Sequence, residues 1–137
     1  MSDRFADTSF LVALLNQNDE AHRLALHYAS EPGLRIVTTK WVLVEFANWF
    51  ATSQARVKVL TFVESLARQP LVTIMSATDS QFAEGLALYD QRHDKAWSLT
   101  DCISFAVMRD IRLTEALTAD HHFEQAGFRA LLRPLSQ

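Results

Sequence analysis

Short apolar runs with strand character alternate along this chain with longer segments of helical periodicity. The clearest strand is the short, β-branched run 71–75, and a second buried strand is expected at 34–37. Weaker strands are expected at 4–6, 113–118 and 128–132. Because a helix separates successive strands, the strands should pair in parallel, with helices covering both faces of the sheet. The predicted fold class is α/β.

The helical segments between these strands carry start signals that can be read from the sequence. Thr38 and Thr39 are cap candidates for the helix that follows them, and Thr78 with Gln81 forms a capping box. Helices are expected over 9–16, 21–29, 40–52, 57–68, 78–89 and 99–109, with a polar loop over 90–97.

Length and cysteine content limit the class of protein. A chain of 137 residues with 49% hydrophobic residues can fill one core, so a single domain over 1–137 is expected. The chain contains neither GxGxxG nor a P-loop, which excludes the common nucleotide cradles. The single cysteine, Cys102, lies in an apolar run and is expected to be a core residue in a reducing compartment. Without an export signal or an apolar run of membrane-spanning length, a cytoplasmic location with no membrane partner is expected.

The net charge of −3 bears on nucleic-acid binding. Proteins that hold nucleic acid mainly through its phosphates carry a basic face. Here the basic residues are scattered, and the densest group is Arg92, His93 and Lys95. Any nucleic-acid substrate should therefore be held by a local patch, by a metal ion or by a partner chain.

Four acidic residues occupy positions that the predicted sheet should bring to one edge. Asp7 follows the first strand, and Asp120 follows the strand that ends near residue 118. Ligands of open parallel sheets bind beyond the carboxyl ends of the strands. Glu45 lies within a helix among apolar neighbours, where an unpaired carboxylate would be costly. Asp101 lies near the start of the apolar helix that follows the polar loop.

Each acid also has a possible structural role. Asp7 and Asp120 are at positions where they could cap helices, and Ser98 with Asp101 matches a capping box. Taken together, four carboxylates at one rim would repel one another and raise at least one pKa. A hard divalent cation removes that repulsion, and Mg²⁺ or Mn²⁺ prefers oxygen ligands. The adjacent His121 and His122 are expected to lie in a loop and to form a poor zinc pair.

Four short segments contain the acids: Asp7-Thr8-Ser9, Val44-Glu45-Phe46-Ala47-Asn48, Ser98-Leu99-Thr100-Asp101 and Thr118-Ala119-Asp120-His121-His122-Phe123. In their order, spacing and total chain length they resemble PIN-domain nucleases, and within that family the VapC-type toxins of bacterial toxin–antitoxin pairs. The resemblance covers essentially the whole chain. It implies a three-layer α/β/α fold with a central parallel sheet.

The resemblance also implies a function, that of a metal-dependent endoribonuclease toxin. Asp7, Glu45, Asp101 and Asp120 match the metal-binding acids of the family, and Ser9 matches the small hydroxyl residue beside the first of them. The implied cofactor is Mg²⁺ or Mn²⁺, and the implied substrate is single-stranded or loop RNA. A small antitoxin protein is the implied inhibitory partner. Hydrolysis of the phosphodiester bond by an activated water is the expected reaction.

Several further residues have candidate roles in this interpretation. Asn48, one helical turn after the glutamate, is a candidate for supporting the metal ligands, and Asp94 for an accessory role. Trp41, Trp49 and Phe50 either stack on bases or belong to the core or an interface.

Other function classes fit less well. A phosphatase of the haloacid dehalogenase type needs a second aspartate two residues after the first, where this chain has Ser9. A receiver domain needs paired acids after its first strand. A PIN-fold module that binds RNA or protein without cutting stays open, and metal-dependent cleavage that is lost on mutating Asp101 would exclude it.

Association is the last expectation from the sequence. The helices carry more apolar surface than one small sheet needs, which predicts a homodimer with a groove for a partner helix. The alternative is that these side chains only complete the core. The residues concerned are Ala13, Leu14, Trp49, Phe50, Val59 and Phe62.

Overall fold

The computed structural model describes residues 2–134, which contain five strands and seven helices. The strands are β1 (Ser2–Ala6), β2 (Leu34–Thr39), β3 (Val72–Met75), β4 (Glu115–Leu117) and β5 (Arg129–Ala130). They form one sheet in the order β3-β2-β1-β4-β5, and every pairing is parallel. The predicted α/β class is therefore confirmed.

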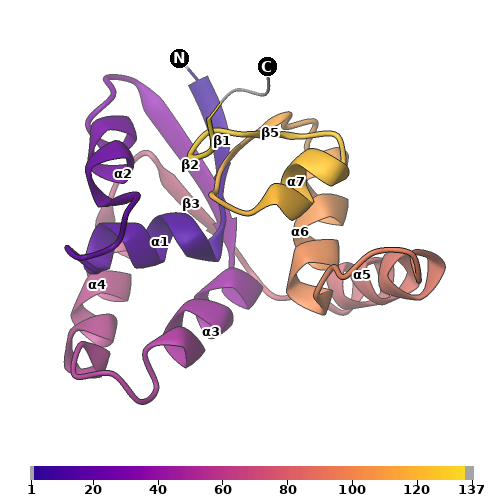
Figure 1. Ribbon diagram of the computed structural model, residues 1–137, viewed down its shortest axis with the longest axis horizontal. Coiled ribbons are helices and arrows are strands. Elements are labelled where there is room, and N and C mark those ends of the chain that lie inside the picture. Colours follow the sequence, from indigo (N-terminus) through magenta and orange to yellow (C-terminus); the bar gives the residue numbers. More distant parts are fainter. Residues whose placement is uncertain (1, 135–137) are drawn as a thin grey trace.

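The helices cover both faces of this sheet. They are α1 (Thr8–Leu15), α2 (His22–Ala29), α3 (Lys40–Trp49), α4 (Arg56–Arg68), α5 (Asp79–Gln91), α6 (Leu99–Asp110) and α7 (His121–Gln125). Helices α1, α2 and α4 lie on one side, and α6 and α7 lie on the other, with α5 packed against α6 (Figure 1). Helix α3 lies at the carboxyl ends of the strands, in contact with both α1 and α6 (Figure 1). Within residues 2–134, no helix has the length and hydropathy needed to cross a membrane.

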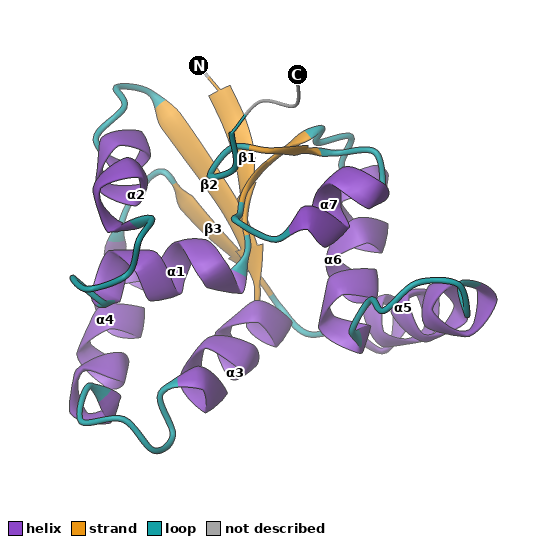
Figure 2. Ribbon diagram, viewed as in Figure 1, coloured by secondary structure: helices purple, strands orange, loops and turns teal. Residues whose placement is uncertain are grey.

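The sheet lies between two layers of helices (Figure 2). Buried apolar side chains from the strands and from both layers form one core. On one side, the ring of Phe105 packs edge to face against Phe123, with centroids 4.9 Å apart. On the other side, Phe46 contacts the rings of Phe50 and Phe62 at 5.3 and 5.2 Å. Burying rings of this size on both faces supplies much of the hydrophobic stabilisation.

This packing changes the interpretation of the apolar helices. Ala13 and Phe50, which the sequence analysis placed among the surplus apolar residues, are 0% and 3% exposed. Both therefore complete the core instead of forming an interface. Of that set, Trp49 stands out with 65% of its surface exposed.

The helix boundaries depart from the prediction by more than one residue at two places. Helix α3 ends at Trp49, three residues early, because the next backbone bonds tighten into a turn in which Phe50 N donates to Ala47 O. Helix α5 continues to Gln91, into the predicted polar loop. It begins at the predicted capping box, in which the Thr78 hydroxyl accepts a hydrogen bond from the backbone N–H of Gln81.

His121 and His122 begin α7, so the prediction that they lie in a loop is wrong. The carboxylate of Asp120 caps this helix, because its Oδ1 accepts a 2.9 Å hydrogen bond from the backbone N–H of His122. A cap of this kind supplies an acceptor for a backbone donor that has no partner within the helix.

Close packing of α5 on α6 depends on Gly85. A Cβ atom at this position would lie 2.2 Å from Ile103 Cγ1 and 3.0 Å from the Ile103 backbone. The glycine therefore allows the two helices to approach more closely than any side chain would permit.

The order of the sheet reverses at β1, which has β2 on one side and β4 on the other. The chain therefore leaves the carboxyl ends of β1 and β4 in opposite directions along the sheet. Between them the backbone N–H of Asp7 donates to Leu117 O at 3.2 Å. In open α/β sheets, this reversal point is where ligands bind.

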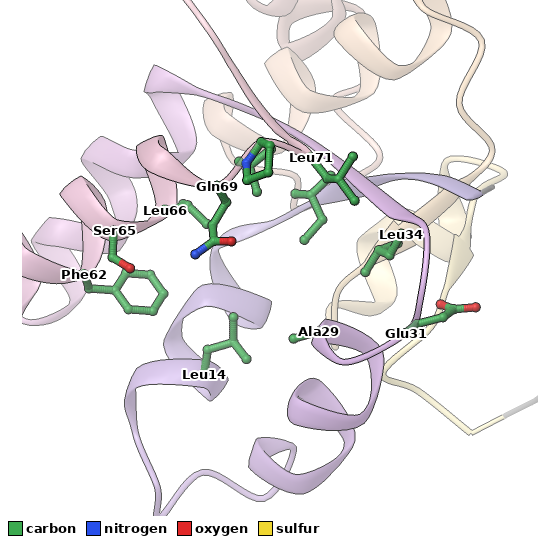
Figure 3. Close-up of a pocket in the computed structure, with 12 residues that line it drawn as sticks. Leu14, Ala29, Glu31, Leu34, Phe62, Ser65, Leu66, Gln69 and Leu71 are labelled. Carbon is green, nitrogen blue, oxygen red and sulfur yellow. The ribbon is translucent and has the colours of Figure 1, made fainter.

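A separate cavity of about 400 Å³ lies near the amino ends of β2 and β3 (Figure 3). Its lining is largely apolar and includes Leu14, Leu66 and Leu71. The carboxylate of Glu31 points away from the centre of this cavity (Figure 3). It forms a salt bridge with Arg4. The cavity therefore presents no cluster of groups suited to catalysis.

Candidate active site

The four predicted acids line a single cavity beyond the carboxyl ends of β1 and β4, with a volume of about 400 Å³. Its side chains come from segments that are far apart in the sequence. Besides Asp7, Glu45, Asp101 and Asp120, the polar and aromatic residues that line it are Thr8, Ser9, Asp19, Trp49, Ser98 and His122.

Asp7 is the most buried of these acids, with only 4% of its surface exposed. Its Oδ2 accepts hydrogen bonds from Thr118 Oγ1 at 2.8 Å and from Ser9 Oγ at 3.4 Å. Although Asp7 precedes α1, its side chain makes no capping bond to that helix. Burial raises the pKa of Asp7 to about 7, against the opposing effect of the Thr118 hydrogen bond, and the charges of Asp101 and Glu45 add to the rise.

Two hydroxyl groups link the ends of β1 and β4. Ser9 Oγ accepts a 2.9 Å hydrogen bond from the backbone N–H of Ala119 and lies 3.1 Å from Thr118 Oγ1. Thr118 Oγ1 also accepts a 3.0 Å hydrogen bond from the backbone N–H of Asp120. Thr118 is fully buried and had no predicted role. The sequence feature that could have indicated a role for Thr118 is a hydroxyl residue at the end of a strand, two positions before an acid.

Glu45 reaches the cavity because α3 lies across the carboxyl ends of the strands. Its Oε1 accepts a hydrogen bond from Thr8 Oγ1, which supplies the donor that a carboxylate in these surroundings requires. Trp49, one turn further along α3, is exposed beside it. Asn48 lies instead in a groove between α3 and α4, away from the acids.

Asp101 combines two of the roles considered for it. The capping box of α6 is present, since the backbone N–H of Ser98 donates to Asp101 Oδ2 at 3.1 Å and that of Asp101 donates to Ser98 Oγ at 3.0 Å. The same carboxylate faces the cavity, where His122 Nδ1 lies 3.1 Å from Oδ2. Burial raises the pKa of Asp101, and the charge of Asp120 raises it further. Capping and participation in the site are thus compatible.

His122 is a residue of the cavity that the sequence analysis missed. Its Nδ1 lies 3.3 Å from Asp120 Oδ1 as well as near Asp101, so the imidazole contacts both carboxylates. Its side chain is 19% exposed, whereas that of His121 is 56% exposed. The sequence shows two adjacent histidines after an acid, but it does not show which of their side chains points into the cavity.

Other candidates lie outside the cavity. Asp94 is exposed and pairs with Arg92 at 2.9 Å, and this hydrogen bond lowers the pKa of Asp94 to about 2. Trp41 Nε1 donates to Gln81 Oε1 at 2.9 Å. Phe50 belongs to the core. Of the three aromatic residues considered for base stacking, Trp49 is the one placed at the cavity.

The donor set fits a divalent cation. The carboxylates of the four predicted acids and of Asp19 line one small cavity, and mutual repulsion contributes to the raised pKa of both Asp7 and Asp101. A cation would offset this repulsion, and hard cations prefer oxygen ligands. The described lining of the cavity includes neither lysine nor arginine, so a bound phosphate would find its compensating charge in such a cation.

Comparison with known proteins agrees with this geometry. The PIN domain family model matches residues 4–129. The chain belongs to the PIN domain family. This PIN domain is 31% identical over 135 residues to the 23S rRNA-specific endonuclease VapC20 of Mycobacterium tuberculosis. The match covers 90% of this chain and 94% of that relative, which confirms the predicted VapC type.

Solved structures show the same fold. The crystal structure of M. tuberculosis VapC20, described as a sarcin-ricin loop cleaving toxin, has a TM-score of 0.84 and 27% identity, and covers 97% of this PIN domain and 100% of that chain. VapBC2 from Rickettsia felis, bound to a promoter DNA fragment, has a TM-score of 0.67 at 11% identity, covering 94% and 97%. FitAcB from Neisseria gonorrhoeae has a TM-score of 0.61 at 16% identity, covering 94% and 95%. The last two show likeness of fold alone.

Proposed function

We propose that this PIN domain is a metal-dependent endoribonuclease and the toxin of a toxin–antitoxin pair. The observation that carries the proposal is the meeting of four carboxylates in one cavity at the reversal point of the sheet. A relative that is 31% identical and named as a 23S rRNA-specific endonuclease gives the substrate class. The substrate we propose is a loop of structured RNA.

Each side chain has a defined task in this proposal. Asp7, Glu45 and Asp101 would hold a Mg²⁺ or Mn²⁺ ion, and Asp120 would shape the site or help to hold a second one. When bound, the ion would supply Lewis-acid chemistry toward the phosphate and lower the pKa of a water molecule. Ser9 keeps the Asp7 carboxylate in place through its hydrogen bond to Oδ2.

Substrate contacts are expected at the mouth of the cavity. Trp49 is 65% exposed beside Glu45, so its indole is free to stack on an unpaired base. Stacking of this kind favours single-stranded or loop RNA over a duplex, whose bases are already stacked.

Metal binding to the folded protein tests the assignment of the acids. At ten times its dissociation constant, Mn²⁺ should stabilise the fold by about 1.4 kcal/mol, which corresponds to a rise in melting temperature of roughly 3–6 °C. Asp101→Asn should reduce this rise because a ligand is lost. Asp3→Asn is the matched control, since Asp3 lies at the amino end of β1 and pairs with Arg35 on the surface.

The measurement is thermal melting of all three proteins in chelator and in Mn²⁺, alongside cleavage of 23S rRNA under the same conditions. An equal metal-induced rise in Asp101→Asn and in the parent would mean that Asp101 only caps α6. Cleavage that persists in chelator would contradict metal dependence.

The antitoxin is proposed to bind in the groove between α3 and α4, which has a volume of about 610 Å³. Val44 and Leu60, on either side of this groove, are 57% and 69% exposed, so the groove presents apolar surface to a partner. Helix α3 presents Val44 to the groove and Glu45 to the acidic cavity. A partner helix seated in the groove would therefore lie next to the active site and obstruct access of RNA.

The proposed homodimer uses a different surface. Phe82, Leu86 and Tyr89 follow one face of α5 and are 42%, 44% and 50% exposed. Helix α5 projects from the body of the molecule, so this stripe is accessible to a second copy (Figure 1).

Two substitutions test the two interfaces and serve as controls for each other. Leu60→Asp should weaken capture of the small protein encoded beside this chain by at least about tenfold, because a charge would enter an apolar contact. Leu86→Asp should convert a dimer to a monomer in light scattering at tens of micromolar. Loss of both properties in both variants would indicate unfolding, and circular dichroism identifies that case. Retention of partner binding by folded Leu60→Asp would overturn the groove assignment, and a monomeric parent would overturn the dimer.

A further inference from the structure

We propose that His121 and His122 form, with Asp120 and Asp101, a site that binds Zn²⁺ in preference to Mg²⁺. The sequence analysis expected this adjacent pair to be a poor zinc pair in a loop, and on a regular helix adjacent side chains diverge by about 100°. At the start of α7, however, the two imidazole rings lie with their centroids 4.4 Å apart. One candidate ligand atom from each of Asp120, His121 and His122 lies within 4.8 Å of the others.

Three separations between candidate ligand atoms are close to those of a zinc site. His122 Nδ1 lies 3.1 Å from Asp101 Oδ2 and 3.3 Å from Asp120 Oδ1, and His121 Nδ1 lies 3.7 Å from the same Asp120 oxygen. Zinc bonds to nitrogen and oxygen are about 2.0–2.1 Å long, so tetrahedral ligands stand about 3.3–3.4 Å apart. These three separations, among two nitrogens and two oxygens, are therefore close to the spacing that Zn²⁺ requires.

The chemistry of the donors sets the preference. Imidazole nitrogen suits Zn²⁺ and other late transition metals, whereas Mg²⁺ requires oxygen ligands in octahedral geometry. Two carboxylates and two neutral imidazoles also balance the charge of a single Zn²⁺ ion. The cavity therefore has an oxygen-only half around Asp7 and Glu45 and a mixed half around His122, beside which the ring of His121 lies.

The two halves share Asp101, and this has a regulatory consequence that rests on the proposed nuclease function. Zn²⁺ in the mixed half would occupy a carboxylate that the catalytic ion needs. Micromolar Zn²⁺ is therefore expected to inhibit RNA cleavage in millimolar Mg²⁺.

The test is Zn²⁺ binding measured by competition with a chromophoric chelator, with Co²⁺ absorption as a second readout of tetrahedral geometry. The parent should bind one Zn²⁺ per chain in the presence of excess Mg²⁺. His122→Asn should weaken binding at least about tenfold, as is found when groups around metal sites are removed. His121→Asn, at an exposed position that should not disturb folding, should also weaken it.

His93→Asn is the matched control. His93 is exposed and lies 3.6 Å from the Asp90 carboxylate, but it belongs to neither half of the cavity. It should bind Zn²⁺ as the parent does. Unchanged affinity in both His121→Asn and His122→Asn, or displacement of Zn²⁺ by equal Mg²⁺ in the parent, would overturn the zinc site.

Asp7→Asn separates this proposal from the proposed function. Asp7 is outside the mixed half, so the variant should keep its Zn²⁺ affinity while losing RNA cleavage. Retained cleavage with intact zinc binding would overturn the nuclease assignment alone. Lost cleavage together with unchanged zinc binding in both histidine variants would overturn the zinc site alone.

Discussion

Asp7→Asn and Asp101→Asn are each expected to lower the rate of metal-dependent RNA cleavage by at least about 10³-fold. Metal ions stabilise transition-state charge by several kcal/mol, and each 1.4 kcal/mol corresponds to about tenfold in rate. An amide is nearly the same size as a carboxylate but carries no charge, so a metal ligand is lost while the packing is kept. Asp7 Oδ2 is buried against Thr118, and an amide oxygen can accept the same hydrogen bond.

The measurement is single-turnover cleavage of 23S rRNA in millimolar Mn²⁺ and Mg²⁺. Asp3→Asn serves again as the control, because Asp3 lies on β1, the strand that Asp7 follows, and pairs with Arg35 at the surface. Such surface pairs contribute little to stability. Full activity of both active-site variants would remove the assignment of the cavity, and absence of cleavage in the parent would favour the non-cutting module.

The second large effect concerns stability and pH in the absence of metal. The pKa of Asp7 is raised from 3.8 to about 7 in the folded protein, because the carboxyl is buried beside other acids. Between these values the folded state holds a proton that the unfolded state has released. The free energy of unfolding should therefore fall as the pH rises from about 4 to 7, and then become level. A change of about three pKa units corresponds to about 4 kcal/mol.

Asp7→Asn should remove this contribution. In chelator at pH 8 the variant should be more stable than the parent by up to about 4 kcal/mol, or about 10 °C in melting temperature. Near pH 4 the two proteins should melt together. The slope that Asp101 contributes should persist in the variant, since the pKa of Asp101 is also raised.

Urea denaturation of both proteins at several pH values in chelator measures this difference. Adding Mn²⁺ should narrow the difference at pH 8, because the parent binds the ion more tightly than the variant. If the free energies of unfolding of the two proteins changed in parallel across pH 4–8, the pKa of Asp7 would not be raised in the folded protein. A variant that loses activity while gaining stability would show that the site is maintained at a cost to the fold.

Much of the site could be predicted because parallel sheets follow a simple geometric rule. Asp7 and Asp120 each follow a strand, and the carboxyl ends of parallel strands lie at one edge of the sheet. The capping box of Ser98 and Asp101 could also be predicted, because it depends on residues three positions apart. Signals of this kind involve residues within a few positions of one another, so they do not depend on how the rest of the chain packs.

Contacts between distant residues could not be predicted in this way. Thr118 meets Asp7 across 111 residues, and Thr8 meets Glu45 across 37. The direction of Glu45 depends on α3 lying across the sheet edge, and the burial of Ala13 and Phe50 depends on which helices pack over them. None of these facts is encoded by periodicity.

The amino-acid sequence by itself determined the α/β class, the strands and the helices before α7, and the positions of the four acids, because hydrophobic spacing and caps act locally. Tertiary structure alone decided which hydroxyl groups hold those acids and that His122 points between Asp101 and Asp120. It also decided that Asp101 both caps α6 and faces the cavity. The physical reason is that side-chain direction at the start of a short helix is set by how that helix packs, and packing is settled by the whole core at once.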